Sequence, residues 1–299
     1  MSKIAIVGSV TLDFVFQIPR MPEAHEKLQA GQMIVAGGGS ASNVAHWLSS
    51  LGHDVKMFSV VGDDPMSSIA VDSLAQAGVD ITGIRRMPGI GPSVMAIFTN
   101  GNYKSMVGAG TWDVAKSCWD EMLRETDFST FDRVHIIPKV YGNLFGTGRR
   151  ADLVDIPVSA DLNGTYSPQM IADLDLAFSN YDEISAQTGT SDIRTKVAAD
   201  LTGKQYALIV TRSREDVTSY GSGTETRIKP KAVDVIDRAG GGDAFCAGYL
   251  HAMNAGASSD TAIKTGLHLA GIVISALGCR PASAEVDATL CTLKIRFPT

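Results

Sequence analysis

Short apolar runs rich in β-branched residues alternate with longer stretches of helical periodicity along most of the chain. Strand-like runs occur in KIAIVG and VKMFSVVG, and helical patterns follow them in NVAHWLSSLG and MSSIAVDSLAQAG. Later strand-like runs are RVHIIP, IPVSADL, LAFSN and YALIVT, the last followed by a polar segment. Strands that alternate with helices indicate a parallel sheet with helices on both faces. The predicted fold class is therefore α/β, with a doubly wound, mostly parallel sheet flanked by helices.

Two segments interrupt this alternation. One extends from DFVFQI to QMIVAGG, and the other is SVMAIFTNGNYKSMV, in which Asn100-Gly101 is a strong hairpin signal between alternating strands. We expect them to form a small antiparallel β lid, inserted at about residues 12–36 and 93–108. Two long apolar helices are expected at about residues 242–255 and 258–277. Without an internal repeat or linker, the chain is interpreted as a single domain over residues 1–299.

Composition narrows the class of protein. Of the 299 residues, 44% are hydrophobic and 19% are charged, and no window reaches the roughly 18 uninterrupted apolar residues of a membrane span. The net charge of −6, without a concentrated Lys/Arg stripe, argues against nucleic-acid binding. The apolar run in MSKIAIVGSV is too short for a signal peptide and is interpreted as a strand ending at Gly8. We expect a soluble, cytoplasmic protein without membrane contact.

The four cysteines and six histidines show no metal-ligand spacing. The cysteines are expected to be reduced and mostly buried. No G-x-x-x-x-G-K-[ST] motif occurs, which excludes a P-loop kinase at the level of sequence.

A run of glycines precedes an aspartate in DRAGGGDAFCAGYL, where Gly240, Gly241 and Gly242 come directly before Asp243 and an apolar helical pattern. A helix start exposes unpaired N–H groups and a partial positive charge, so glycines there allow a phosphate to approach the backbone closely. The alternative is a flexible turn in which Asp243 is an N-cap. This segment by itself leaves both interpretations open.

Two further segments suggest ligand contacts. In AGGGSASNVAHW, Gly38 and Gly39 precede Asn43 and a helix, which fits either backbone contact with a ligand or a tight strand-to-helix turn. In VGSVTLD, Asp13 follows a strand end, where ligands gather in open α/β sheets, although a turn or capping role is the alternative.

These three segments and NYDE, residues 180–183, occur in an order that resembles the ribokinase-like (PfkB) family of sugar and nucleoside kinases over nearly the whole chain. The resemblance implies an ATP-dependent phosphotransferase that phosphorylates a hydroxyl group of a small sugar. It also implies that the sugar lies between core and lid, and that ATP enters at the carboxyl end of the sheet.

Asp243 matches the catalytic base of that family. A carboxylate with an ordinary pKa of about 4 is ionised at neutral pH and can accept the proton of a substrate hydroxyl. The backbone amides of Gly240, Gly241, Gly242 and Asp243 would then form an anion hole for the transferred phosphoryl group.

The resemblance assigns other residues to the two substrates and to metal ions. Sugar-binding positions match Asp13, Gly38, Gly39 and Asn43. ATP-binding positions match Asn180, Thr211, Gly240 and Gly242. Glu183 would organise Mg²⁺ through water, because magnesium keeps several waters. Asp237 matches a monovalent-cation position, so K⁺ is a further expected cofactor.

Some positions depart from the family pattern. The family sequence D-T-x-G-A-G-D appears here with Arg238 for threonine and Gly241 for alanine. Arg238 would contact nucleotide phosphate or reach solvent. In VTRSREDV, Ser213 and Asp216 occupy glycine positions of a T-x-G-x-x-G pattern, and Gly110 replaces the asparagine of G-A-N.

Two alternatives follow. A nucleoside kinase, of adenosine or pseudouridine type, would need an apolar slot for the base, which Phe14, Phe16, Met95 or Phe98 would supply unless they pack within the lid. The altered ATP loop motivates a catalytically weak sensor of sugars or nucleosides on the same fold.

Sugar is preferred to sugar phosphate as substrate, because no basic cluster lies beside Gly38 to Asn43 in the sequence. The exposed edges of a lid sheet favour pairing, so a homodimer is expected.

Overall fold

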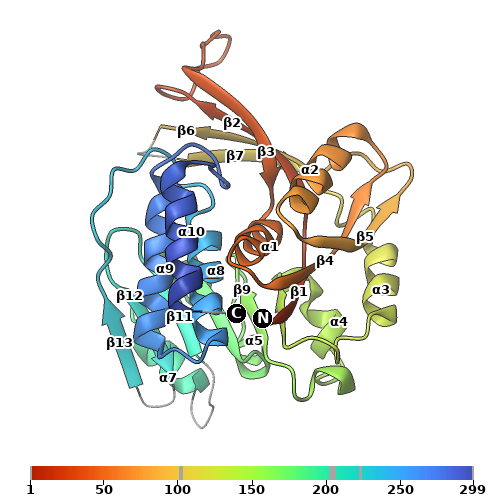
Figure 1. The fold of residues 1–299 in the computed structure, drawn as a ribbon, viewed down its shortest axis with the longest axis vertical. Coiled ribbons are helices and arrows are strands. Elements are labelled where there is room, and N and C mark those ends of the chain that lie inside the picture. Colours follow the sequence, from red (N-terminus) through yellow and green to blue (C-terminus); the bar gives the residue numbers. More distant parts are fainter. Residues whose placement is uncertain (1, 101–103, 202–206, 222–223, 298–299) are drawn as a thin grey trace.

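The larger of two sheets has nine strands in the order β13-β12-β11-β10-β9-β8-β1-β4-β5 (Figure 1). The computed structural model describes residues 2–100, 104–201, 207–221 and 224–297. Neighbours from β5 to β11 run parallel, whereas β12 is antiparallel to β11 and β13 is antiparallel to β12. The strands are β1 (Lys3–Val7), β4 (Asp54–Gly62), β5 (Asp80–Met87), β8 (Arg133–Ile136), β9 (Val158–Asp161), β10 (Leu176–Asn180), β11 (Ala207–Thr211), β12 (Val217–Gly221) and β13 (Thr224–Ile228).

Helices flank this sheet, and Figure 1 shows α1, α8, α9 and α10 together over one face. The helices are α1 (Ser40–Ser50), α2 (Pro65–Gln76), α3 (Lys116–Glu125), α4 (Tyr141–Phe145), α5 (Pro168–Asp173), α6 (Tyr181–Thr188), α7 (Ile193–Leu201), α8 (Gly241–Asn254), α9 (Ser259–Ile274) and α10 (Ala284–Arg296). Short 3₁₀ turns cover Pro138–Val140 and Ala151–Leu153. The α/β fold class is confirmed. Among the described residues, no helix is long and apolar enough to cross a membrane.

The core follows from the strand composition. The central strand β1 has the sequence KIAIV, and its last four residues are fully buried because helices cover both of its faces. Helix starts are set by local chemistry. Asp64 accepts hydrogen bonds from Met66 N and Ser67 N at the start of α2, and Pro65 occupies the first helical position.

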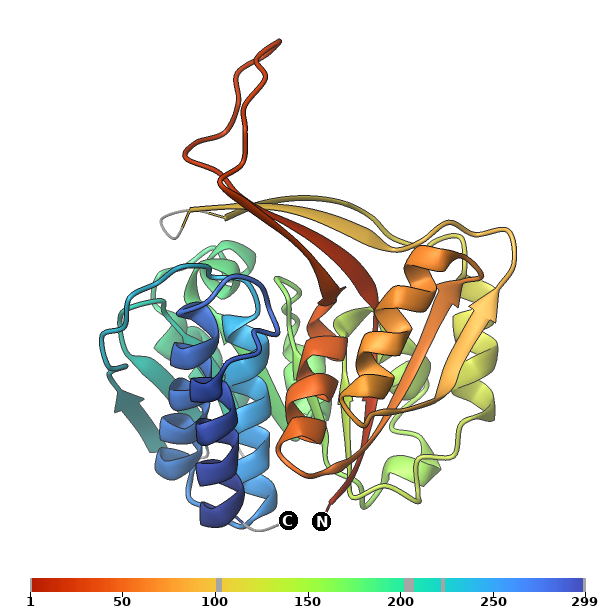
Figure 2. The same cartoon turned by 45° about the horizontal axis from the view of Figure 1, so that its top comes forward.

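A second, four-stranded sheet lies across the carboxyl ends of the core strands (Figure 2). Its order is β3-β2-β6-β7, with β2 and β6 parallel and the outer pairs antiparallel. The strands are β2 (Thr11–Gln17), β3 (Gln32–Gly38), β6 (Val94–Thr99) and β7 (Lys104–Ala109). We call this sheet the lid. The predicted Asn100-Gly101 turn extends into residues 101–103, outside the described part.

Small apolar contacts hold the lid on the core. Val15 and Ile97 of the lid form a buried cluster with Ala239 and Cys279 from two core loops. The connection between β2 and β3 projects beyond the lid into solvent (Figure 2). Leu12 of β2 also belongs to the main core, and Phe14 and Val94 pack against it, so buried apolar side chains join the lid to the core.

Candidate active site

A cavity of about 470 Å³ lies between the lid and the core. Asp161, Asn180 and Thr211 line it as the last residues of β9, β10 and β11. The carboxyl ends of parallel strands are the usual place for ligands in an open α/β sheet. The sequence-predicted residues lining the cavity are Asp13, Gly39, Asn43, Asn180, Glu183, Thr211, Gly240, Gly242 and Asp243.

The glycines at residues 240–242 start α8, as the sequence predicts, and each has its own steric reason. Gly240 has a left-handed backbone, with φ of 73°, and a Cβ there would lie 2.7 Å from Cα of Cys279. A Cβ on Gly241 would lie 2.6 Å from Ile274, so this glycine allows α8 to pack against α9. A Cβ on Gly242 would meet no atom within 4 Å, because this residue faces the cavity. No side chain caps α8, so its first N–H groups are available to an anion.

Asp243 lies in the first turn of α8 with both carboxylate oxygens engaged. Ser40 Oγ donates to Oδ1 at 2.8 Å, and Asn43 Nδ2 donates to Oδ2 at 2.7 Å. Desolvation raises the pKa of Asp243 above its usual value, although the hydrogen bonds from Asn43 and Ser40 and the charges of Lys104 and Arg280 oppose this shift. The ordinary pKa assumed from the sequence is therefore wrong. The surrounding protein makes Asp243 a stronger proton acceptor than a carboxylate in water.

The second glycine cluster surrounds Asp13. Asp13 is on β2, where Thr11 Oγ1 donates to it at 2.6 Å, and burial raises its pKa. A Cβ on Gly38 would overlap the Asp13 carboxylate. Gly39 connects β3 to α1 with φ of 93°, and a Cβ there would lie 2.6 Å from the carbonyl oxygen of Ser9. These glycines make room for a carboxylate and a tight strand-to-helix turn, and Gly38 itself does not line the cavity.

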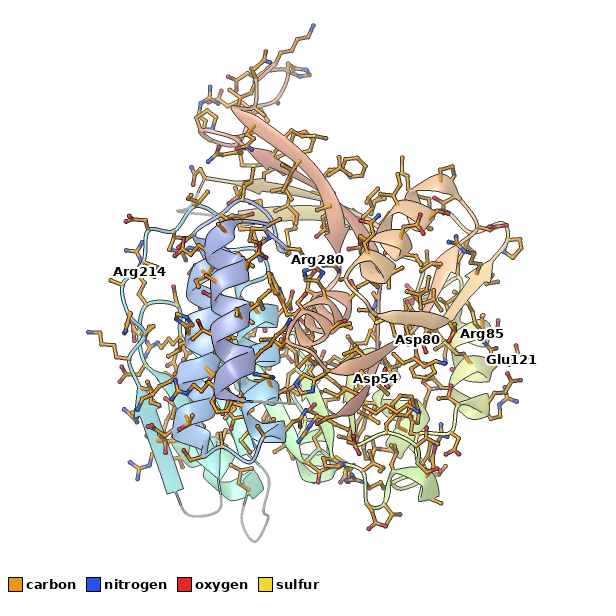
Figure 3. The ribbon with its side chains drawn as sticks, viewed as in Figure 1. Asp54, Asp80, Arg85, Glu121, Arg214 and Arg280 are labelled. Atoms are coloured by element: carbon orange, nitrogen blue, oxygen red, sulfur yellow. The ribbon has the colours of Figure 1, made fainter. Side chains whose placement is uncertain are left out.

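Four residues that shape the site are absent from the sequence prediction. Ser40 holds Asp243, as described above. Lys104, at the start of β7, lines the cavity and lowers the pKa values of Asp13 and Asp243 by its charge. Arg280 lies under the lid close to α1 (Figure 3). The contacts of Ser40 and Arg280 join parts of the chain that are 203 and 237 positions apart, which no local pattern indicates.

Asp161 is the fourth such residue. Burial, and the negative charges of Asp243 and Glu183, raise its pKa to about 7. Asp161 ends a buried strand and precedes Asn163, and both residues line the cavity. Asp161 could have been predicted as a site residue from the sequence, because it is a polar residue at the carboxyl end of a predicted parallel strand.

The side of the cavity that contains the predicted ATP-binding residues is held by fewer hydrogen bonds. Asn180 caps α6 by accepting a hydrogen bond from Glu183 N at 2.9 Å, and Thr211 Oγ1 contacts Ser179 O at 3.5 Å. Ser213 adopts φ of 49°, so this serine keeps a left-handed conformation at one of the glycine positions of the family pattern. Arg238 is exposed and lines the cavity. Its side chain is therefore placed for either alternative, nucleotide phosphate or solvent.

The candidate metal residues differ in setting. Among the described residues, no group of three or more His, Cys, Asp or Glu is arranged to hold a metal ion. Glu183 and Asp161 line the cavity and offer two carboxylates, which suits a magnesium ion that keeps waters and phosphate oxygens as its other ligands. Asp237 is buried, and its oxygens accept from Ala239 N and Gly278 N, both at 3.0 Å. Asp237 thus ties together two loops beside the cavity.

Three of the four residues predicted to form an apolar slot for a nucleobase do not line the cavity. Side chains alternate along β2, and Asp13 and Val15 face the cavity side, so Phe14 and Phe16 lie on the opposite face, where Phe14 packs against the main hydrophobic core. Phe16 stacks on Phe98 at 5.5 Å. Met95 alone of the four predicted residues lines the cavity, joined there by the lid residue Met106.

All four cysteines are free, as predicted, but only Cys246 and Cys279 are buried. Cys118 is half-buried and Cys291 is exposed. The expectation of mostly buried thiols therefore holds for two of the four.

The fold and cavity together define an α/β protein with a lidded cavity at a helix N-terminus. Residues 1–286 match the pfkB family of carbohydrate kinases, and the chain belongs to this family. It is 26% identical to the ATP-dependent ribose-1-phosphate kinase of Halopiger xanaduensis, over 99% of this chain and 100% of that protein. The crystal structure of the Methanocaldococcus jannaschii nucleoside kinase superposes with a TM-score of 0.76 at 26% identity, covering 98% of this chain and 99% of the other. The Arabidopsis thaliana ribokinase solved with ribose and ATP has a TM-score of 0.74 at 17% identity, with 98% of each chain covered.

Proposed function

We propose that this protein transfers the γ-phosphoryl group of ATP to a hydroxyl group of a small sugar, with Asp243 as the general base. The observation that carries the proposal is the placement of Asp243 and the open N-terminus of α8 in one cavity under the lid. The substrate hydroxyl gives its proton to Asp243 while its oxygen forms a bond to the γ-phosphorus. The bond from that phosphorus to the ADP oxygen then breaks, and the N–H groups of residues 240–243 stabilise the charge on the transferred group.

The acceptor sugar is assigned to the end of the cavity beneath the lid. Asp13 and Asn43 present polar groups there, with Gly38 and Gly39 shaping the backbone around them. We assign ATP to the opposite end, beside Asn180 and Thr211. Under this assignment, the reacting hydroxyl lies between Asp243 and the phosphate.

Mg²⁺ is assigned to Glu183 and Asp161, held mainly through water. The ion would neutralise charge on the ATP phosphates. A K⁺ ion near Asp237 is also proposed, and faster turnover in potassium than in tetramethylammonium salts would support it.

A nucleoside is the second candidate acceptor. Met95 and Met106 give the lid side of the cavity an apolar lining that suits a nucleobase. The kinship with a nucleoside kinase, reported above, points the same way. We keep this alternative as an outcome of the substrate test.

We further propose one kinase domain that acts in the cytoplasm as a homodimer paired through the lid. Paired positions on the outer lid face are apolar, and Met33, Val35 and Val107 are 45%, 46% and 68% exposed. Burying such a face between two copies is favourable. Light scattering that gives a monomer mass would count against the pairing.

The test is ADP release from Mg-ATP across pentoses, hexoses, deoxy sugars, sugar phosphates and nucleosides. Asp243→Asn should lower kcat by about 10² to 10⁴-fold for the preferred acceptor. The matched control is Asp260→Asn, which changes an exposed aspartate in the first turn of α9 that does not line the cavity. Turnover that survives in Asp243→Asn rejects the assigned base. Acceptor binding without any turnover in the native protein would instead favour the sensor.

A further inference from the structure

Arg280 follows the loop after α9 and directs its guanidinium into a site built from three other segments (Figure 3). Its Nε donates to Asn43 Oδ1 at 2.8 Å. Nη2 donates to Ser42 Oγ at 2.6 Å, and Nη1 donates to Ser73 Oγ at 3.1 Å. Nη2 also lies 3.5 Å from the carbonyl oxygen of Gly38. One side chain therefore connects the start of α1, the end of β3 and the last turn of α2.

A glycine makes room for this arrangement. A Cβ on Gly37 would lie 2.6 Å from Nη1 of Arg280 and would also overlap Ser73 Oγ. The first glycine of the AGGG segment thus has a steric role that is separate from those of Gly38 and Gly39.

The contact with Asn43 determines which way its amide faces. A guanidinium only donates hydrogen bonds and an ionised carboxylate only accepts them. Because Asn43 lies between Arg280 and Asp243, its oxygen must face Arg280 and its nitrogen must face Asp243. A reversed amide would bring its oxygen towards the carboxylate and leave the Arg280 donor without its acceptor, and both changes are unfavourable.

We propose that Arg280 is a positioning residue for the phosphoryl-transfer step, acting on the base through the Asn43 amide. It holds the Asn43 nitrogen against Oδ2 of Asp243 and so keeps the carboxylate aimed at the acceptor hydroxyl. This inference rests on the proposed kinase function.

Arg280 also contributes charge. The pKa of Arg280 is lowered by burial to about 10, so it is a cation at neutral pH, and its charge lowers the pKa values of Asp243 and Asp13. Four other titratable groups lie close to this carboxylate pair. They are Lys104 of the lid, Asp161 of β9, Cys246 of α8 and Cys279 of the loop after α9. Loss of the Arg280 charge should therefore raise the pKa of Asp243 and move the acid limb of kcat/KM to higher pH. The acid limb should remain visible, because the other groups are still present.

The experiment compares steady-state kinetics against pH for four variants, using the acceptor found in the substrate test. Arg280→Gln should lower kcat about 10²-fold, as expected for misplacement of a reacting group, with the acid limb at higher pH and little change in KM for ATP. Arg280→Lys keeps the positive charge but lacks the planar set of donors. The acid limb of kcat/KM should therefore stay near its native pH, while kcat should lie between that of the native protein and that of Arg280→Gln. Gly37→Ala keeps every hydrogen-bonding group but displaces the guanidinium, and should also lower kcat.

The matched control is Ser73→Ala, which removes the α2 contact of Arg280 and leaves the Asn43 contact intact. It should show native kcat and a native pH profile, whatever its effect on melting temperature. If Arg280→Gln keeps the native pH profile and kcat and loses only melting temperature, as expected for Ser73→Ala, the role is structural and the inference is wrong. If Arg280→Gln does not fold, Arg280→Lys and Gly37→Ala decide the matter, and native kcat in both rejects the inference. Absence of turnover in the native protein rejects the kinase function instead.

Discussion

The two ends of the cavity are built differently. At the acceptor end, Asp13, Asn43 and Asp243 are held by several hydrogen bonds and by glycines whose replacement would cause overlaps. At the nucleotide end, Asn180 has one helix-capping bond, Thr211 has one long contact, and Arg238 is exposed. A preorganised end loses little freedom when its ligand binds, so acceptor selectivity should reside there. The proposed nucleotide end should rely on backbone N–H groups and on exposed charges such as Arg238.

Among the changes that compare the two ends of the cavity, the largest effect on substrate binding is expected at Gly38. Gly38→Ala should raise KM for the acceptor by at least about tenfold, because the new methyl group displaces the Asp13 carboxylate and a lost charged hydrogen bond costs about 1.5–3 kcal/mol. KM for ATP should change little. Gly31→Ala is the matched lid control, since its Cβ comes no closer than 3.8 Å to Gln17 O. Equal changes in both KM values would show that the two ends are not independent.

The next effect tests the nucleotide end. Gly242→Ala should lower kcat/KM for ATP several-fold, since the methyl group points into the cavity where phosphate is proposed to bind. The same change should raise stability by about 0.5–1 kcal/mol, because alanine favours a helix more than glycine does. Gly142→Ala in α4 also meets open space and lies outside the cavity, so it should leave the kinetics unchanged. Thermal melting and kinetics on the same samples measure both effects, and native ATP kinetics in Gly242→Ala would argue against the anion hole.

A third effect depends on pH. With a folded pKa of about 7, Asp161 is ionised above that pH and protonated below it. If Asp161 supports Mg²⁺, the apparent Mg²⁺ affinity should weaken by up to about tenfold per pH unit below 7 and level off above 7. Titrations of turnover with Mg²⁺ between pH 5.5 and 8.5 measure this. Asp161→Asn should remove the dependence, and an identical pH dependence in that variant would reject the assignment.

The smallest effect is expected in the altered ATP loop. Ser213→Gly should stabilise the protein by about 1 kcal/mol or less, because glycine adopts φ of 49° without the cost that serine bears. KM for ATP should remain native, because Ser213 already adopts the left-handed backbone conformation that a glycine would have at this position. A large gain in ATP affinity would mean that the serine side chain itself hinders the nucleotide.

Local patterns predicted the features that depend on neighbouring residues. The apolar runs located the parallel strands, and the glycines before Asp243 predicted a helix start, which the structure shows beside the cavity. The β12–β13 pair was missed because its residues, VTSYG and TETRI, are largely polar at the sheet edge. The helix α10 was missed as well, because its apolar residues are scattered around the helix.

The rest of the site depends on contacts that only the fold creates. Arg280 meets Asn43 across 237 positions, and Ser40 meets Asp243 across 203. An isolated arginine or serine shows no periodicity or motif that reveals such a partner. The raised pKa of Asp243 has the same origin, because desolvation depends on what surrounds the carboxylate and not on its neighbours in the chain.

The position of Gly39 couples movement of the lid to the residues that hold Asp243. It is the single residue between β3, which belongs to the lid, and α1, which presents Ser40 and Asn43 to the base. A rotation of the lid about this hinge would reach the two donors of Asp243 directly. Opening of the lid would then disturb the hydrogen bonds that align Asp243 in the closed arrangement, so ATP in an open site would face a poorly aligned base. Such coupling would protect ATP from wasteful transfer to water.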